Sequence, residues 1–322
     1  MELPPPLRRA IDHVLSGTPL AELAATAAAL SQRYRQERRD GRSYIASDQD
    51  ALAYLAVRLP ATYVAIRASF AAIADARPDF VPKSALDIGA GPGTALWAAT
   101  DCWPDLADAL LIEASAIFRA FGERLAAEGR LPRVTWQIAD VAVSSIDCAP
   151  SDLVVLAYTL NELGPDVRAS VLQRLWQMTA DVLVIVEPGT PAGWQRILAA
   201  RRQLIESGAH VIAPCPHAYA CPLQPPDWCH FAERVARSRL HRQAKNATVP
   251  WEDEKFSYIA VSRNPASTAA TRIIARPRKA SGRVTLKLCR PDGMTHEQLF
   301  SRRDGALFKR ASRGNWGASL EL

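Results

Sequence analysis

SALDIGAGPGTALWAATDCWPDLADALLIE, residues 84–113, is the stretch that decides how this chain folds. Its apolar beginning predicts a strand, and the alternating glycines Gly89, Gly91 and Gly93 predict a tight turn into a helix. Glycine permits a close backbone approach to a ligand, and the helix beyond it presents free N–H groups and the positive end of its dipole. A second apolar run ends on Glu113, an acid placed to accept hydrogen bonds from both hydroxyls of a ribose. The stretch therefore predicts a site for a nucleoside-containing cofactor.

The order of these features resembles motifs I and II of class I S-adenosylmethionine (SAM) methyltransferases. The three glycines alternate after an acid, Asp87, whereas a dinucleotide fingerprint reads G-x-G-x-x-G. The resemblance implies that Asp87 and the glycine backbone face the methionine part of SAM and that Glu113 binds the ribose. A dinucleotide or flavin site, and a site that binds nothing, are the alternatives. The residues expected in this part of the cofactor site are Asp87, Gly89, Ala90, Gly91, Gly93 and Glu113.

Strands alternate with helices through the middle of the chain, which predicts a parallel sheet covered on both faces. The expected strands are 85–89, 109–113, 134–138, 152–157 and 182–187, and the expected helices are 95–100, 115–128, 166–179 and 194–206. Ligands of such sheets bind at the carboxyl ends of the strands. Asp140, after the third strand, is placed to bond the adenine amino group or, equally, to act as an ordinary loop or cap acid.

The fourth strand leads into the segment Y-T-L-N-E-L, which faces the methyl acceptor in the implied fold. Asn161 and Glu162 are therefore the candidate catalytic residues; capping the next helix is their other possible role. No N-P-P-Y-type amine clamp and no cysteine for covalent pyrimidine chemistry stand at this position. The sequence thus predicts a cofactor site more clearly than a catalytic one.

Residues 5–80 read as a helical arm that covers the sheet or contacts the substrate. Good helix formers fill 21–36, Asp48 is placed to cap a second helix, and Pro60 begins a third that ends near Ala76. A basic patch at one helix end reads as an ordinary solvated face. It consists of Arg33, Arg35, Arg38, Arg39 and Arg42.

The chain has 322 residues, of which 48% are hydrophobic, enough for a core in one large or two moderate domains. No apolar run approaches the ~20 residues of a membrane span, and nothing near Met1 resembles a secretory signal, so a cytoplasmic location is expected. The net charge of +6 is uneven, because residues 231–322 hold 19 Lys and Arg against 8 Asp and Glu. This basic third predicts a nucleic-acid partner; a solvated basic surface without a partner is the alternative.

Clustered cysteines in a cytosolic protein suggest metal or redox chemistry rather than disulfides. Three of the six cysteines lie with two histidines in a knuckle, 214–230, that is too rich in proline for a helix or a central strand. Their C-x5-C-x7-C spacing differs from the C-x2-C of zinc ribbons, and a later cysteine can complete the four thiolates of a [4Fe–4S] cluster. The histidines are alternative ligands that would favour zinc. The candidate ligands are Cys215, Cys221, Cys229 and Cys289, with His217 and His230 as the alternatives.

Several segments together resemble the Rsm22 family of methyltransferase-like proteins of the mitochondrial and bacterial small ribosomal subunit. They are the glycine loop, L-N-E-L, E-P-G-T, the P-C-P-H…C-P…W-C-H-F run, L-C-R-P-D-G and N-W-G. The resemblance extends from about Tyr44 to Trp316 and is weakest in the first forty residues. It implies an iron–sulfur cluster on the four cysteines named above and binding to the small subunit during assembly.

The basic C-terminal third is expected to add a helix, a strand and a hairpin. Residues 230–245 read as a basic helix, and 256–262 read as an antiparallel strand of the main sheet. The runs 272–276 and 283–289 flank a basic tip and predict a hairpin. Charged and aromatic residues of the tail suit phosphate contacts and base stacking, or else a solvated tail. They are Arg302, Arg303, Phe308, Lys309, Arg310, Arg313 and Trp316.

The whole sequence predicts an α/β, Rossmann-like class I SAM-methyltransferase domain in residues 81–264, with the cysteine knuckle inserted. A helical N-terminal region, 1–80, precedes it, and a basic β-rich extension, 265–322, follows it. The expected partner is the small ribosomal subunit with its 16S-type rRNA, and neither a membrane nor DNA is expected. Methylation of rRNA is the first functional hypothesis, and a non-catalytic assembly factor is the second. The charge asymmetry disfavours a third, a small-molecule methyltransferase.

Overall fold

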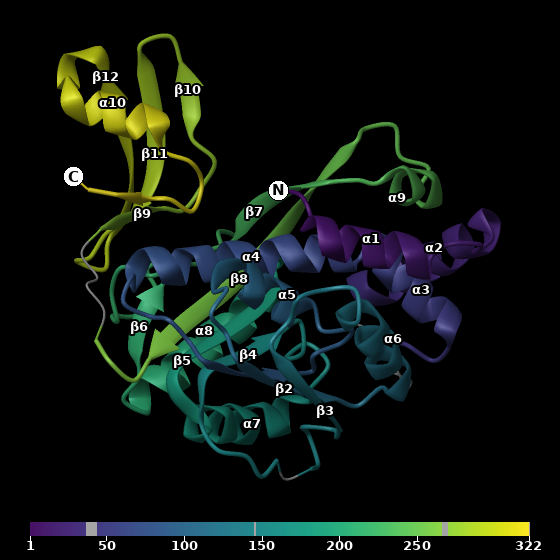
Figure 1. Cartoon of the computed structure of the whole chain (residues 1–322). Coiled ribbons are helices and arrows are strands. Elements are labelled where there is room, and N and C mark those ends of the chain that lie inside the picture. Colours follow the sequence, from purple (N-terminus) through teal and green to yellow (C-terminus); the bar gives the residue numbers. More distant parts are fainter. Residues whose placement is uncertain (37–43, 145, 266–269, 322) are drawn as a thin grey trace.

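The computed structural model describes residues 1–36, 44–144, 146–265 and 270–321. These residues form a large mixed sheet with helices on both faces and a small second sheet near the C-terminus (Figure 1). Arg38, Arg39 and Arg42 of the expected basic patch lie outside the described residues. In the part of the chain that the structure describes, no helix is both long enough and apolar enough to cross a membrane.

The large sheet has eight strands. They are β1 (Ser84–Ile88), β2 (Asp108–Glu113), β3 (Arg133–Ile138), β4 (Ser151–Ala157), β5 (Thr179–Pro188), β6 (His210–Ala213), β7 (Phe231–Ala236) and β8 (Trp251–Ser262). Their order is β3-β2-β1-β4-β5-β8-β6, with β7 paired to β8. The first five strands are parallel and the order reverses between β1 and β4, which is the Rossmann-like arrangement. β8 runs antiparallel to β5 and β6. The predicted class I methyltransferase fold is therefore confirmed, including the antiparallel strand.

The N-terminal arm is helical, as predicted. It consists of α1 (Pro5–Val14), α2 (Leu20–Arg35), α3 (Asp48–Val57) and α4 (Leu59–Ala76). The predicted cap of α3 is wrong by one residue, because Ser47 accepts the N–H of Asp50 while the Asp50 carboxylate accepts the N–H of Ser47. The long helix α4 contributes Phe70 and Ile73, both fully buried, to the main core. The arm is thus an integral part of the fold.

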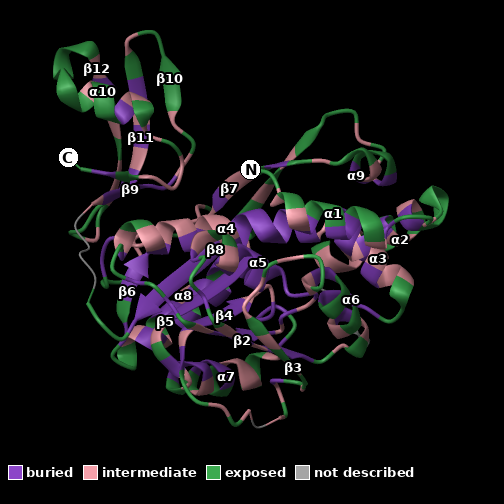
Figure 2. Cartoon of the chain, in the orientation of Figure 1, coloured by how far each residue is buried: buried purple, intermediate pink, exposed green. Residues whose placement is uncertain are grey.

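Four helices follow strands of the large sheet and cover its two faces (Figure 1). They are α5 (Thr94–Cys102), α6 (Ala116–Ala126), α7 (Pro165–Gln177) and α8 (Pro191–Glu206). One face packs on the helical arm with α5 and α6, so that Val155 of β4 shares a core with Phe70. The other face packs on α7 and α8, where Ile185 of β5 meets Leu172. Burial on both faces explains why the central strands read as continuous apolar runs and appear purple in Figure 2.

The knuckle, 214–230, contains no helix or strand and connects β6 to β7. The prediction of a basic helix over 230–245 is wrong for its first half, which forms β7; only α9 (Arg239–Ala244) is helical. The cause is a tertiary contact, since the Phe231 ring packs against Phe256 and Tyr258 of β8 at centroid distances of 6.1 and 5.4 Å. Pairing along β8 overrides the local helix propensity of the segment.

The small sheet is built from residues after 270. Its elements are β9 (Thr271–Ile273), β10 (Arg278–Ala280), β11 (Arg283–Cys289), β12 (Thr295–Ser301) and β13 (Ser319–Leu320), with the short 3-10 helix η1 (Arg302–Asp304) and α10 (Ala306–Arg313). A hairpin is present, but its first strand is β10, which lies in the predicted tip, and Gly282 in its turn has a φ of +68°. The predicted first strand, 272–276, overlaps β9, which pairs with the other end of β11. Leu286 and Phe300 give this sheet a small core of its own. In Figure 1 it stands apart from the large sheet, in yellow.

Candidate functional site

The glycine turn lies at the carboxyl end of β1. Gly89, Gly91 and Gly93 have φ values of +66°, +55° and +79°, a conformation that other residues rarely adopt. A Cβ on Gly89 would lie 2.3 Å from Oγ1 of Thr159, so the neighbouring strand end leaves no room for a side chain. A Cβ on Gly91 would meet only the Phe118 ring, at 3.9 Å. The turn thus leaves open space beside Gly91, as a cofactor-binding loop requires.

Two buried acids flank this turn. Oδ2 of Asp87 has no hydrogen-bond partner among the described residues, and burial, with the nearby charge of Glu113, raises the pKa of Asp87 to about 8. Glu113 accepts the N–H of Gly91 at 2.7 Å with Oε2 and the N–H of Ser115 at 2.8 Å with Oε1. Burial raises the pKa of Glu113, and these backbone hydrogen bonds oppose the rise. Glu113, the acid predicted to bind a ribose, is therefore hydrogen-bonded to the glycine turn.

A cavity of about 1120 Å3, which we call the main cavity, opens at the carboxyl ends of the parallel strands. Six residues predicted for the cofactor or the acceptor line it: Gly89, Gly91, Glu113, Asp140, Asn161 and Glu162. The other three predicted cofactor residues, Asp87, Ala90 and Gly93, are not on its wall; Asp87 and Ala90 are buried. The structure thus brings together most of the residues predicted from the two motifs and from the end of β4.

Three acids at the strand ends, Glu113, Asp140 and Glu162, form what we call the acidic wall. Asp140 accepts the N–H of Ala142 at 2.8 Å, so it closes a turn and also lines the cavity. Asn161 beside Glu162 is only 3% exposed. Burial raises the pKa of Glu162 to about 8, and Glu113, Glu187 and Asp140 add to the rise. Carboxyl groups held away from water in this way would be stabilised by a bound cation.

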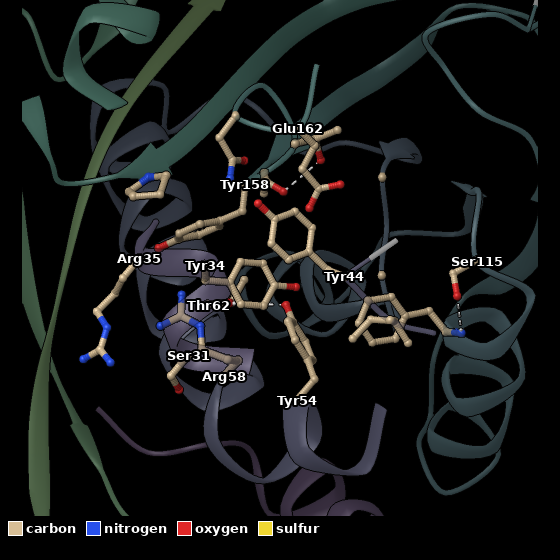
Figure 3. A pocket seen from close by; sticks show the side chains of 18 of the residues that line it. Ser31, Tyr34, Arg35, Tyr44, Tyr54, Arg58, Thr62, Ser115, Tyr158 and Glu162 are labelled. Atoms are coloured by element: carbon tan, nitrogen blue, oxygen red, sulfur yellow. Dashed lines mark hydrogen bonds between the residues drawn. The ribbon is translucent and has the colours of Figure 1, made fainter. Parts of the chain in front are cut away.

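The opposite wall of the main cavity comes from the helical arm, to which sequence reasoning assigned no site residue. The rings of Tyr34 and Tyr44 stack with centroids 4.5 Å apart, and the Tyr54 ring meets the edge of Phe118 at 4.9 Å. Figure 3 shows these three tyrosines turned toward one another, with Tyr158 and Glu162 nearby. With Tyr158, four of the seven tyrosines of the chain line this cavity. The clustering of tyrosines on the arm was the signal that could have identified them.

Tyr158 stands at the end of β4 in the left-handed region, with a φ of +56°. This conformation costs a non-glycine residue about 1–2 kcal/mol. The Tyr158 hydroxyl donates to Oε1 of Glu254 at 3.0 Å, and Arg58 pairs with the same oxygen at 3.6 Å. Interactions with β8 and with the end of α3 therefore hold this strained residue in place beside Asn161.

The four predicted cysteines gather around a second, small cavity of about 40 Å3. Cys215, Cys221 and Cys229 come from the knuckle and Cys289 comes from β11, and none forms a disulfide. Burial raises the pKa of Cys229 well above its usual value, and the other three thiols add to the rise. Burial, then Cys215 and Cys221, likewise raises the pKa of Cys289 to about 12. The raised pKa values mean that these thiols do not ionise readily by themselves. Because all four face one cavity, they fit a bound group whose positive charge would stabilise the thiolates.

The histidines of the knuckle differ in their relation to this cavity. Nε2 of His217 lies 3.5 Å from Sγ of Cys289, and His217 lines the cavity. His230 does not line it and stacks on Trp228 at 4.9 Å. Among the described residues, no three His, Cys, Asp or Glu side chains approach closely enough to hold a single metal ion. The four thiols therefore line one cavity, but among the described residues they do not converge on the position of a single metal ion.

Buried hydrogen bonds anchor the knuckle to its surroundings. Arg272 of β9 donates to the carbonyl of Pro214 at 3.0 Å and to that of Gly317 at 2.7 Å. Arg201 of α8 donates to the carbonyl of His217 at 2.7 Å. These contacts fix the three knuckle cysteines relative to the sheet that carries the fourth.

The basic residues predicted in the tail are on the surface, whereas its aromatic residues are used in packing. The exposed cations are Arg302, Arg303, Lys309, Arg310 and Arg313. The Trp316 ring packs edge-on against His230 at 4.8 Å, and Phe308 packs against the core of the small sheet. The tail thus presents positive charge on its surface, while these two rings pack within the fold and form no exposed stacking face.

Known proteins resemble this chain in sequence, and one family model matches most of it. The family model described as mitochondrial small ribosomal subunit Rsm22 matches residues 48–321. The chain is 30% identical over 300 residues to the human ribosome assembly protein METTL17, mitochondrial, with 84% of this chain and 62% of that protein covered. It is 21% identical over 328 residues to the Rsm22-cox11 tandem protein 2 of Schizosaccharomyces pombe, covering 86% and 44% respectively. The chain thus spans less than two thirds of the length of these relatives.

Solved structures of methyltransferases are also similar, at low identity. One is the plantazolicin methyltransferase BpumL in complex with SAH, with a TM-score of 0.43, 13% identity, and coverage of 76% of this chain and 98% of that one. Another is magnesium protoporphyrin IX methyltransferase of Synechocystis PCC 6803 with bound SAM, with a TM-score of 0.42, 13% identity, and coverage of 73% and 91%.

The family match extends from the start of α3, through the main cavity and the knuckle, into the small sheet. It includes every residue predicted for the cofactor and all four gathered cysteines. The chain belongs to the Rsm22 family.

Proposed function

We propose that this protein acts in assembly of the small ribosomal subunit as a SAM-binding protein that contacts the rRNA and transfers a methyl group to it. The observation that carries the proposal is the main cavity, in which an open glycine turn and the acidic wall share one space in a member of the Rsm22 family. The two mitochondrial relatives named above, a ribosome assembly protein and an Rsm22 tandem protein, support the ribosomal partner. The excess of basic residues in 231–322 supports contact with RNA.

The residues present fit SAM in charge and in shape. SAM carries a sulfonium and an ammonium group, and the acidic wall supplies carboxylates for positive charge. The space beside Gly91 admits a close ligand, and the orphaned Oδ2 of Asp87 supplies a buried acceptor behind the turn. Glu113 would hold the ribose by exchanging its bond from Gly91 for bonds from the hydroxyls. When bound, SAM supplies a methyl group on a positively charged sulfur.

The protein's own contribution to such a reaction would be placement. Asn161 and Glu162 follow β4 at the side of the main cavity where the acceptor is expected. Burial raises the pKa of Glu162 to about 8, and a cationic cofactor beside it would favour the ionised form, whose carboxylate could accept a hydrogen bond from an acceptor group. Tyr158, held by Glu254, lines the same cavity as Asn161 and would help to shape the acceptor side. Positioning of this kind accounts for much of the rate in methyl transfer.

The test is transfer of labelled methyl from SAM to purified small ribosomal subunits. Gly91→Arg is the blocking variant, because it places a long side chain in the open space beside the glycine turn. Arg202→Glu, an exposed change on α8, is the matched control. Label in rRNA that disappears only with Gly91→Arg would establish the activity. Binding of all three proteins to the particle without label would refute methyl transfer and leave a non-catalytic assembly factor.

The hydrogen bonds that Glu113 already accepts are the observation that favours the second function, a non-catalytic assembly factor. Both of its oxygens already accept backbone N–H groups, as they would in a fold that keeps the methyltransferase sheet as a scaffold. Calorimetry with SAM, carried out in the presence of small subunits, separates the two functions at the binding step. No heat of binding, with intact binding to the particle, would support the scaffold.

We also propose that Cys215, Cys221, Cys229 and Cys289 hold a [4Fe–4S] cluster. Four thiols that line one cavity, with Cys289 buried and the other three half-buried, provide the donor set of such a cluster. Zinc is the alternative, but a zinc ion bonds its sulfurs at about 2.3 Å from one centre, and no such single-ion arrangement exists among the described side chains. The cluster would link the knuckle to β11 and so couple metal binding to folding.

Iron and acid-labile sulfide assays on anaerobically purified protein test the cluster. We expect about four of each per chain. Each of the four cysteines changed to serine should lower both values, whereas Cys148→Ser, outside the cavity, should leave them unchanged. Stoichiometric zinc without sulfide would refute the cluster.

A further inference from the structure

The main cavity is divided electrostatically. The acidic wall lies at the ends of β2, β3 and β4. Four cations line another part of the cavity, which we call the basic wall. They are Arg35 of α2, Arg58 at the end of α3, Arg237 after β7 and Lys245 at the end of α9. The main cavity therefore has acidic side chains on one part of its wall and basic side chains on another part.

Two acids offset only part of the basic wall. Glu254 pairs with Arg58 at 3.6 Å, and Glu252 pairs with Arg237 and with Lys245, each at 2.9 Å. Arg35 is exposed and makes no ion pair with any residue that the structure describes. Four cations against two acids leave an excess of positive charge at this part of the cavity. An anionic ligand group would therefore be attracted to it.

The four tyrosines Tyr34, Tyr44, Tyr54 and Tyr158 line the same cavity as the two walls. In Figure 3 the Arg35 side chain extends away from the three tyrosines of the arm. Tyr34 and Tyr44 stack on each other, with Arg58 over the Tyr34 ring and Arg33 over the Tyr44 ring, so they form a stacked column of rings and guanidinium groups. Aromatic rings and guanidinium planes are the groups on which proteins stack nucleobases, with little dependence on sequence. The volume, about 1120 Å3, slightly exceeds the range of about 300–1,000 Å3 typical of pockets for one small ligand. The cavity therefore has room for a cofactor and for a second group.

We infer that the arm side of the main cavity is an acceptor subsite for one RNA nucleotide taken out of its base stack, with the base at the tyrosines and a backbone phosphate at Arg35 and Lys245. The inference rests on the proposed function and specifies its acceptor. A base in this subsite would reach the side of the cavity that carries Asn161 and Glu162, while the cationic cofactor occupies the acidic wall. The nucleotide must leave its stack because α2 and the β7–β8 segment enclose the subsite.

The arrangement explains why the arm and α9 pack together. α9 lies in the connection between β7 and β8, and it packs against α2 of the arm. This contact places Lys245 and Arg35, which are 210 positions apart, on the wall of one cavity. The basic C-terminal tail would then hold the particle by general phosphate contacts, and the subsite would select the nucleotide.

The test is photocrosslinking from inside the cavity. A benzophenone amino acid replaces Ser31, which lines the subsite one helical turn before Arg35, and the protein is irradiated with purified bacterial small ribosomal subunits. The same amino acid at Glu206, an exposed position of α8 outside both cavities, is the control for surface contacts. We expect a crosslink to rRNA from position 31.

Charge variants then connect the crosslink to the basic wall. Arg35→Glu combined with Lys245→Gln should remove most of the crosslink from position 31, whereas Arg202→Glu should not. Because Lys245 pairs with Glu252, Arg35→Gln alone serves as the milder variant and should still lower the yield. Losing a phosphate contact should also reduce the salt dependence of binding, by about one unit of log–log slope per contact. SAM binding, measured by calorimetry, should stay unchanged because neither residue touches the acidic wall.

The outcomes separate this inference from the function on which it rests. Particle binding without a crosslink from position 31, a crosslink to protein instead of RNA, or a crosslink insensitive to both charge variants would each overturn the subsite. If the unmodified protein fails to bind the particle at all, the proposed function fails and the subsite fails with it.

Discussion

In the absence of SAM, Asp87→Asn should raise the free energy of unfolding relative to the unchanged protein. This difference should grow as the pH rises from 5 to 7. In the folded chain Asp87 keeps its proton up to a pKa of about 8, because it is buried and lies near Glu113. In the unfolded chain an aspartate ionises near pH 3.9. The unfolded state therefore binds fewer protons than the folded state between these values, and the free energy of unfolding falls as the pH rises.

The size of the effect follows from the two pKa values. One protonation difference changes the free energy of unfolding by about 1.4 kcal/mol per pH unit, so Asp87 should remove on the order of 3 kcal/mol between pH 5 and 7. The asparagine variant cannot ionise and should lack this loss. Other titrating groups act on both proteins and cancel in the difference. The expected change is thus an advantage of the variant that grows by on the order of 3 kcal/mol over two pH units.

The assay is urea denaturation of both proteins at pH 5, 6 and 7. Asp79→Asn is the control, because hydrogen bonds from Arg77 lower the pKa of Asp79. A lowered pKa contributes stability that is present above the unfolded value and is lost only at more acidic pH, so this control should show a constant difference from pH 5 to 7. A constant difference for Asp87→Asn as well would refute the argument, since it would mean that Asp87 is ionised in the folded state.

Three further predictions concern the turn, a buried ion pair and the cysteine site. Gly89→Ala should cost about 3 kcal/mol by thermal or urea unfolding, because its Cβ would lie 2.3 Å from Oγ1 of Thr159 at a φ of +66°, and Thr159→Ala should restore part of the loss. Arg196→Ala should cost about 3–5 kcal/mol in the same assay, because it removes the 2.5 Å ion pair of the fully buried Glu187; a cost below about 1 kcal/mol would contradict this. Cys289→Ser should lose the metal and make residues 270–321 sensitive to protease, whereas Cys148→Ser should do neither; equal proteolysis of both would count against a cluster that links the sheets.

The sequence predicted the large sheet well because its signals are local. Alternating strands and helices, the turn from Gly89 to Gly93 and the acid at Glu113 depend on neighbours in the chain. The prediction was wrong at 231–236, where Phe231 packs on Phe256 of β8, 25 positions further along the chain. Local propensity carries no information about such a partner.

The same limit explains which site residues were missed. The gathering of the cysteines around one cavity could be predicted because the spacing of three of them within a proline-rich segment is visible in the sequence. The tyrosines of the arm and Lys245 become site residues only when α2 and α9 meet over the strand ends. Tyr34, Tyr44 and Tyr54 are ten positions apart, which places them on no single helix face. Their clustering in the arm is visible in the sequence, but their meeting at one cavity depends on how α2, α3 and the segment between them pack.

The bond between Glu113 and Gly91 sets a limit on what SAM affinity can prove. A ribose that binds Glu113 must replace a charge-assisted hydrogen bond of 2.7 Å from the Gly91 N–H, and such bonds contribute about 1.5–3 kcal/mol. The new bonds from two hydroxyls are of similar size, so their net contribution to SAM binding is small. Weak SAM binding by the isolated protein is therefore expected even for an enzyme. If rRNA contacts open Glu113, affinity should rise on the particle, and SAM binding measured with and without small subunits distinguishes an enzyme that awaits its substrate from a scaffold that has closed its site.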